Sequence, residues 1–134
     1  MLVDTSVWID FLNGHESAAA VRLTRAIADG ESIALTGPIL TEVLIGLKDS
    51  ATAQKVAYLL DAFAMPPELD RAGYEEASAL YRHCRAQGYT IRSTIDCLIA
   101  QICLRDGLPL LTKDRDFVAI AQCSALRLVQ AAEA

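Results

Sequence analysis

The chain has 134 residues and a formal net charge of −5, and this length fits one domain built around a single hydrophobic core. Hydrophobic residues make up 53 % of the sequence and charged residues 22 %, which is typical of a globular protein and excludes a disordered one. The apolar runs are far shorter than the roughly 20 residues that a bilayer requires, and the first residues lack a basic and apolar leader, so we expect a cytoplasmic protein without a membrane span or signal peptide.

The first quarter of the chain is predicted to contain two strands and two helices. Residues 2–3 form a short apolar run that indicates a buried strand, and residues 5–12 follow it as a turn and a helix. Residues 18–28 carry apolar side chains at helical spacing and precede a glycine. Residues 33–35 form another short apolar run, which indicates a second buried strand.

The middle of the chain is predicted to be helical. Pro38 suits the first turn of a helix that would run to about residue 47. Further helices are expected over residues 51–63 and 71–87. A helix over residues 93–105 places several isoleucines and a leucine on one stripe, which indicates that it packs on a core.

The last part of the chain returns to short strands. Residues 109–112 predict a third strand, a short helix follows Asp114, and residues 126–129 predict a fourth strand. Short apolar strands separated by helices indicate a parallel sheet covered on both faces. We therefore predict an α/β sandwich with one domain over residues 1–134, whose ligand site would lie at the carboxyl ends of the strands.

Three aspartates lie in the turns that follow expected strands. Asp4 comes after the first strand, and Asp114 and Asp116 come after the third. A helix N-cap or an Asx-turn would explain any one of them without chemistry. Two acids at positions i and i+2 of one turn are harder to explain by capping alone.

Two further acids lie on expected helices. Asp96 has a sound structural explanation, because Ser93 and Asp96 form a capping-box pattern and the helix dipole favours an acid there. Glu42 lacks such an explanation, because the residues one helical turn away are uncharged. We therefore expect its carboxylate in an apolar setting, where it would need a cation or a donor.

All five acids can converge at one rim of the predicted sheet. Their mutual repulsion would be strongly unfavourable without a counter-ion, and oxygen-rich sites suit Mg²⁺ or Mn²⁺. Such a centre activates water and stabilises charge on a phosphodiester, so the chemistry requires no histidine. The two histidines, His15 and His83, lie beside no candidate nucleophile. Without the five acids the net charge would be zero, so the overall charge does not exclude a nucleic acid.

Two other residue types leave room for interpretation. The four cysteines form no CxxC pair and fall in helical segments, so we expect buried, reduced thiols: Cys84, Cys97, Cys103 and Cys123. Several bases fall close together in the sequence: Arg82, His83, Arg85 and Arg92. A solvated helix face and a phosphate-binding surface explain these bases equally well.

The acids and their neighbours resemble a known family. The motifs are Asp4-Thr5-Ser6 near the N-terminus, Glu42 on an early helix, the segment 96–100, and the segment 111–117. In this order and spacing they resemble the PIN-domain ribonucleases, specifically the VapC-type toxins of type II toxin–antitoxin pairs. The resemblance covers nearly the whole chain. It implies a three-layer α/β/α sandwich with a mostly parallel sheet of four to five strands.

The resemblance also implies a function and roles for particular residues. It implies cleavage of RNA at a Mg²⁺ or Mn²⁺ centre, with Asp4, Asp96 and Asp114 as metal ligands and Glu42 and Asp116 as further catalytic acids. Two hydroxyl residues would line the pocket, Ser6 and Thr112. It further implies a homodimer and a cognate antitoxin, through which operator DNA would be bound indirectly.

The target RNA and two other functions remain open at this point. The candidates for substrate contact are Arg85, Tyr89 and Arg92, but no motif identifies the RNA. A non-catalytic module could use the acidic rim to dock a basic peptide. A metal-dependent phosphatase is less consistent with the sequence, because Asp4 is not followed by a second aspartate two residues later and no glycine-rich phosphate loop is present.

Overall fold

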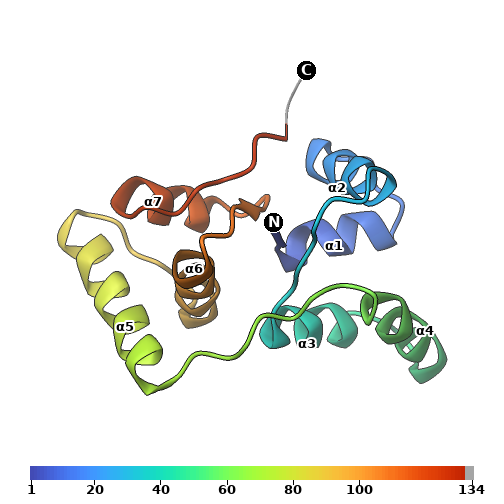
Figure 1. Ribbon diagram of the computed structural model, residues 1–134, viewed down its shortest axis with the longest axis horizontal. Helices are drawn as coiled ribbons and strands as arrows, with labels where there is room; N and C mark the ends of the chain where they lie inside the picture. Colours follow the sequence, from blue (N-terminus) through green and yellow to red (C-terminus); the bar gives the residue numbers. More distant parts are fainter. Residues whose placement is uncertain (132–134) are drawn as a thin grey trace.

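A parallel sheet runs through the centre of the molecule in the computed structural model, which describes residues 1–131 (Figure 1). Its two central strands are β1 (Leu2–Val3) and β2 (Leu110–Leu111), which pair in parallel with Leu2 opposite Leu110. All four residues are fully buried, as expected for strands that are covered on both faces. The short apolar runs of the sequence therefore mark the middle of the sheet.

Single-residue bridges extend this sheet on both sides. Ala34 bridges to Leu2 and to Ala64, and Leu128 bridges to Leu110, all in parallel. The aligned segments thus follow the order 64, 34, β1, β2, 128. Five segments agree with the expected four to five, although only two of them are more than one residue long within the described chain.

The segment at Ala64 was not predicted as part of the sheet. Residues 51–63 were expected to be helical, but the helix ends at Leu60 and the chain then turns into the sheet. There the Leu35 N–H donates to the Ala64 carbonyl, and the Ala64 N–H donates to the Ile33 carbonyl. Residues 61–63 form a turn with hydrogen bonds back to residues 57–60, and the sheet contacts begin at Ala64.

Four helices lie on one side of the sheet, to the right of the strands in Figure 1. They are α1 (Thr5–Leu12), α2 (Ala18–Ala28), α3 (Gly37–Ile45) and α4 (Ser50–Leu60). Side chains cap three of them, since Ser17, Thr36 and Asp49 each accept a hydrogen bond from a backbone N–H of the first turn. The predicted bounds of α1 and α2 are correct, and α3 ends two residues before the predicted position.

Three helices lie on the other side and pack against one another (Figure 1). They are α5 (Arg71–Ala86), α6 (Thr94–Asp106) and α7 (Arg115–Cys123), all close to their predicted positions. Gly107 ends α6 in the left-handed conformation (φ 65°), which allows the chain to reverse into β2. The result is the predicted three-layer α/β/α arrangement.

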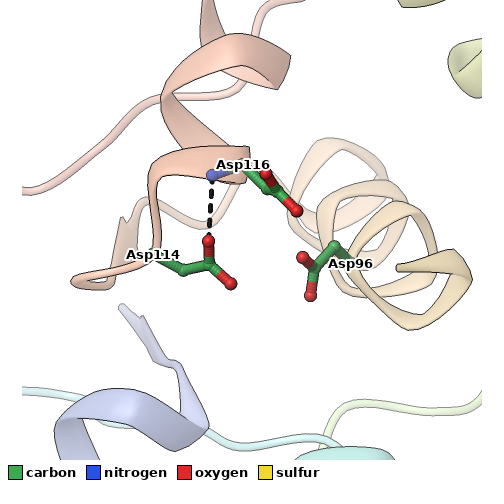
Figure 2. Close-up of side chains that lie close together, drawn as sticks. All are labelled: Asp96, Asp114 and Asp116. Atoms are coloured by element: carbon green, nitrogen blue, oxygen red, sulfur yellow. Dashed lines mark hydrogen bonds between the residues drawn. The ribbon is translucent and has the colours of Figure 1, made fainter. Parts of the chain in front are cut away.

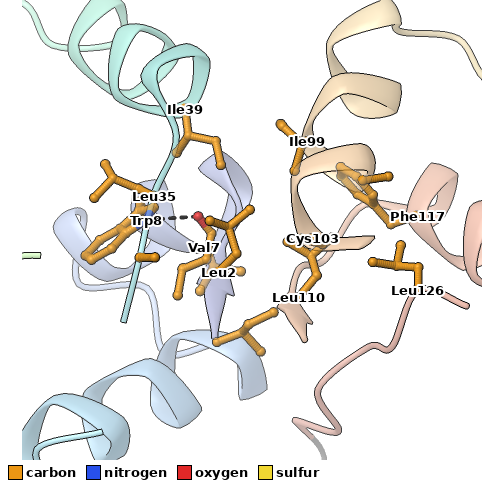
Figure 3. Close-up of a cluster of buried hydrophobic side chains, with 14 of the residues drawn as sticks. Leu2, Val7, Trp8, Leu35, Ile39, Ile99, Cys103, Leu110, Phe117 and Leu126 are labelled. Carbon is orange, nitrogen blue, oxygen red and sulfur yellow. Dashed lines mark hydrogen bonds between the residues drawn. The ribbon is translucent and has the colours of Figure 1, made fainter. Parts of the chain in front are cut away.

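The hydrophobic core occupies both faces of the sheet (Figure 3). Trp8 and Ile39 cover one face of the strands, while Ile99 and Phe117 cover the other. The buried Trp8 side chain satisfies its polar group by donating from Nε1 to the Val3 carbonyl at 3.1 Å. This bond fixes α1 against β1, and Asp4 lies between these two elements.

Two expectations about the environment of the chain can be compared with the structure. All four cysteines are free and buried, as predicted. They are core residues, and burial raises the pKa of the Cys103 thiol to about 12. No helix within residues 1–131 combines the length and the apolar character needed to cross a bilayer.

Candidate metal centre

Three carboxylates meet at the carboxyl end of the sheet (Figure 2). Asp96 extends from the first turn of α6, while Asp114 and Asp116 lie at the start of α7. One oxygen from each residue lies within 4.8 Å of the corresponding oxygens of the other two. Because α6 precedes β2 and α7 follows it, the sheet itself brings these acids together.

Asp96 is the most unusual member of this cluster. Its side chain is 8 % exposed, and its Oδ2 is buried without a hydrogen-bond partner among the described residues. Burial, as the larger cause, and the nearby charges of Asp114, Asp4, Asp116 and Glu42 together raise the pKa of Asp96 to about 7. The capping-box explanation does not hold, because the Ser93 side chain makes no cap hydrogen bond.

Asp4 lies next to this cluster and is held by hydroxyl groups. Ser6 Oγ and Thr112 Oγ1 both donate to Asp4 Oδ2, each at 2.9 Å. Thr112 Oγ1 in turn accepts from the Asp114 N–H at 3.0 Å, and Ser6 Oγ accepts from the Lys113 N–H at 3.2 Å. Burial raises the pKa of Asp4, and the hydrogen bonds from Ser6 and Thr112 partly oppose this rise. The two predicted pocket residues thus connect Asp4 to the turn that carries Asp114.

Asp114 and Asp116 have structural partners as well as the carboxylate cluster. Asp114 is the N-cap of α7, because its Oδ1 accepts from the Asp116 N–H at 2.9 Å (Figure 2). Asp116 accepts from Arg92, whose Nε lies 3.3 Å from Oδ1 and whose backbone N lies 3.4 Å from Oδ2. The capping interpretation of Asp114 is therefore correct, and it leaves the second carboxylate oxygen of Asp114 free of the cap.

Glu42 does not lie in the apolar setting that we expected. Its side chain is exposed on α3, and its Oε1 accepts a hydrogen bond from Thr5 Oγ1 at 2.7 Å. The prediction was wrong because α3 turns its apolar residues Ile39 and Val43 into the core and leaves the intervening Glu42 in solvent. Its charge still contributes to the raised pKa of Asp96, so it lies at the rim of the site.

Some residues around the site were not identified from the sequence. Thr5 holds Glu42, and its position beside Asp4 was the signal that could have identified it. Lys113 pairs with Asp10 of α1 and joins the turn before α7 to the first helix. Lys113 does not stand out in the sequence, because its contact joins segments that are far apart along the chain.

The three candidates for substrate contact lie in different places. Arg92 reaches the cluster through Asp116, and its side chain is 77 % exposed. Tyr89 packs on the core and donates from its hydroxyl to Gln122 Oε1 on α7 at 2.5 Å. Arg85 is exposed on α5, and no hydrogen bond or ion pair found within residues 1–131 connects it to the carboxylates.

The donor set of this site fits a hard divalent cation. All candidate ligands are carboxylate oxygens, the type that Mg²⁺ and Mn²⁺ prefer. The buried and unpartnered Oδ2 of Asp96 is the specific feature that a cation would satisfy. The compact group consists of Asp96, Asp114 and Asp116, with Asp4 beside it rather than within it.

The fold and this acidic site define the class of protein. The family model of the PIN domain matches residues 1–122, so the chain belongs to the PIN domain family.

Among curated proteins the chain is similar to VapC ribonuclease Mb1587 of Mycobacterium bovis and to ribonuclease VapC11 of Mycobacterium tuberculosis. Each is 33 % identical to it over 128 residues, which cover 95 % of this chain and 96 % of the relative. Among solved structures it resembles a chain in the crystal structure of VapBC2 from Rickettsia felis bound to a DNA fragment from their promoter. The TM-score is 0.74 at 19 % identity, with 96 % of both chains covered, which shows a shared fold.

Proposed function

We propose that this chain, as one PIN domain over residues 1–134, is a metal-dependent endoribonuclease and the toxin of a toxin–antitoxin pair. The observation that carries the proposal is the Asp96 carboxylate, which is buried without a partner and faces Asp114 and Asp116. A purely structural role would leave this group costly and unexplained. The names of the two mycobacterial relatives support the choice of RNA as the substrate.

The proposed centre holds Mg²⁺ or Mn²⁺ with Asp4, Asp96 and Asp114, and Asp116 is close enough to take part. The bound ion would lower the pKa of a water molecule and neutralise charge on the scissile phosphate. The chain's own residues prepare this site. Hydroxyl groups orient Asp4 through one oxygen, and the α7 cap orients Asp114 through one oxygen.

The rim of the site would bind the substrate. Glu42, held by Thr5, provides an exposed carboxylate that can accept a proton or orient water. Arg92 would contact an RNA phosphate, since its guanidinium is largely exposed although it pairs with Asp116. Tyr89 and Arg85 are proposed contacts farther from the cluster. Tyr89 would have to release Gln122 to offer its hydroxyl.

The proposed partners are inferred from the similar proteins and not from the geometry of the site. The Rickettsia felis structure is of VapBC2 bound to a DNA fragment from their promoter, and this likeness supports a cognate antitoxin for this chain. Operator DNA would be bound indirectly, through that antitoxin. We further propose that the toxin is a cytoplasmic homodimer.

The function is tested by comparing the purified wild-type protein with Asp4→Asn and Asp96→Asn. Wild type should cleave total RNA with Mn²⁺ or Mg²⁺ and lose this activity in excess EDTA, while both variants should stay folded and inactive. The matched control is Asp61→Asn, which removes an exposed carboxylate at the end of α4 and should cleave like wild type. Mapping of 5′ ends after brief induction would identify the target. Turnover of a small phosphomonoester with RNA left intact would instead indicate a phosphatase.

A further inference from the structure

Helices α5 and α6 line an open pocket of about 300 Å³. Tyr74 and Tyr81 line it from α5, and Thr94 and Cys97 line it from α6. Arg82 is the charged residue of its lining. The volume is at the lower end of ligand-binding pockets, which span about 300–1,000 Å³, so the pocket suits one planar ring system rather than a peptide helix.

We propose that this pocket, called the α5–α6 pocket below, binds one unpaired nucleobase of an RNA strand that lies across the carboxylate cluster. The proposal rests on the proposed ribonuclease function. The two sites share α6, since Thr94 and Cys97 flank Asp96 in its first turns. With about 3.6 residues per turn, Thr94 and Leu98 lie on the side of α6 opposite Asp96. An RNA strand would therefore have to pass around the first turn of α6, about one helix diameter or roughly 10 Å, to join the pocket to the cluster.

The lining suits the faces of a base. Tyr74 is 46 % exposed, and Tyr81 is partly buried against the core, so a base can reach the ring of Tyr74 from solvent while the ring of Tyr81 packs on the core. The two residues are seven positions apart and lie on the same face of α5. Buried Ala77 and the side chain of Leu98 provide an apolar floor. Stacking on tyrosine accepts any base, because every base has a π-face.

The charge of the pocket suits a phosphate at its edge. Arg82 donates from its guanidinium to Ser78 Oγ at 3.0 Å, and Ser78 Oγ donates to the Glu75 carbonyl at 2.9 Å. No carboxylate within the described part of the chain pairs with Arg82, and the lining contains no acid. The guanidinium is thus held in place while its charge remains available to RNA.

The first experiment measures binding of a short single-stranded RNA that carries 2-aminopurine at successive positions, in an Asp4→Asn background with Mn²⁺. Tyr74→Ala should weaken binding about 5- to 100-fold, and Tyr74→Phe should not. The fluorescence of 2-aminopurine should be quenched at one position near the cleavage site, and Tyr74→Ala should relieve this quenching. Tyr58→Ala is the matched control, since Tyr58 is 83 % exposed on α4, away from the pocket.

The second experiment separates the local charge of the pocket from the overall charge of the helix. Arg82→Gln and Arg71→Gln each remove one positive charge from α5, but Arg71 lies in its first turn, outside the pocket lining, and pairs with Glu75. Arg82→Gln should weaken the binding of RNA of any sequence. It should also reduce the slope of log binding constant against log salt concentration by about one. Arg71→Gln should have a much smaller effect.

Each alternative outcome has a definite meaning. A folded Tyr74→Ala protein that binds RNA like its parent and keeps the fluorescence response would overturn the proposal. A change in oligomeric state with unchanged RNA affinity would overturn it too, and would make this face a contact between two copies of the chain. If wild type cleaves no RNA but binding still depends on Tyr74, the ribonuclease function fails while the base-binding pocket stands.

Discussion

The charged carboxylate of Asp96 is destabilising in its buried position, and no structural contact of the fold requires it there. Its carboxylate is buried, one oxygen has no partner, and other acids surround it. Burial and like charges both favour the protonated form, which accounts for the raised pKa of about 7. Groups in this condition tend to occupy functional sites, because a purely structural carboxylate would be paired or exposed.

The pH dependence of stability follows from this pKa. The folded pKa of Asp96 is raised above its ordinary value, so the folded state binds the proton more tightly than the unfolded chain. Its contribution to stability is therefore full at low pH and is lost as the pH rises towards about 7. In EDTA, Asp96→Asn should raise the melting temperature above pH 7 by several degrees, since about 1 kcal/mol corresponds to roughly 4 °C, and change it little near pH 4.

Thermal unfolding in EDTA across this pH range measures the effect. Asp61→Asn serves as the control, because that carboxylate is exposed at the end of α4. An equal melting temperature for wild type and Asp96→Asn at high pH would show that the charged Asp96 carboxylate does not destabilise the folded state.

Thr112 is the second residue with a separable role. Its hydroxyl donates to Asp4 Oδ2 and accepts from the Asp114 N–H, so Thr112→Val removes two hydrogen bonds at nearly constant volume. We expect a loss of about 1–3 kcal/mol of stability and a further rise in the pKa of Asp4. RNA cleavage should fall by about tenfold or more, because Asp4 is no longer oriented. Thr112→Ser keeps the hydroxyl and should retain most of both properties, as measured by denaturant unfolding and initial cleavage rates.

At the scale of elements, most helices and strands could be predicted from local sequence. Helical spacing and the residues at helix ends gave α2 and α5 nearly to the residue. The single-residue pairing of Ala64 could not be predicted, because it depends on hydrogen bonds to residues 33–35 rather than on its neighbours in the chain. Local spacing favoured helix up to residue 63, whereas the helix ends at Leu60 and the chain enters the sheet at Ala64.

The location of two candidate acids could be predicted from the ends of strands, while their role as a site stays a prediction. Asp4 and Asp114 lie at the sheet edge, because parallel strands deliver their carboxyl ends to the same side. The prediction of an apolar environment for Glu42 was wrong, because the residues within one turn on either side do not reveal which face of α3 is exposed. The contact of Arg92 with Asp116 was not predicted, since it joins a loop to a helix 24 positions away.

The N-terminus of α7 combines a cap with a candidate ligand, and substitution can separate the two. Asparagine caps a helix about as well as aspartate, so Asp114→Asn should keep the melting temperature while it weakens Mn²⁺ binding. Asp114→Ala should lose Mn²⁺ binding and also about 1 kcal/mol of stability, because the Asp116 N–H loses its partner. Calorimetry with Mn²⁺ and thermal unfolding in EDTA distinguish the two effects. Equal Mn²⁺ affinities for wild type and both variants would exclude Asp114 as a ligand.

For the whole molecule, a bound cation should reverse the order of stability between wild type and Asp96→Asn. A ligand that binds only the folded state stabilises it by about RT ln(1 + [L]/Kd). Wild type should therefore gain stability in millimolar Mn²⁺, while Asp96→Asn should gain little, so that the variant is more stable in EDTA and less stable in Mn²⁺. Melting curves under both conditions measure this crossing. Equal gains in melting temperature for wild type and Asp96→Asn would show that Mn²⁺ binds at another site.

The hydrogen bond between Thr112 and Asp4 spans 108 positions of the chain, and β1 pairs with β2 over a similar separation. Contacts between such distant segments form late, because the loop between them must first be closed. During translation, β1 leaves the ribosome long before β2, Thr112 and Asp114 exist. A half-made polypeptide would thus lack the assembled carboxylate centre, and with it the proposed activity towards the message from which it is being read.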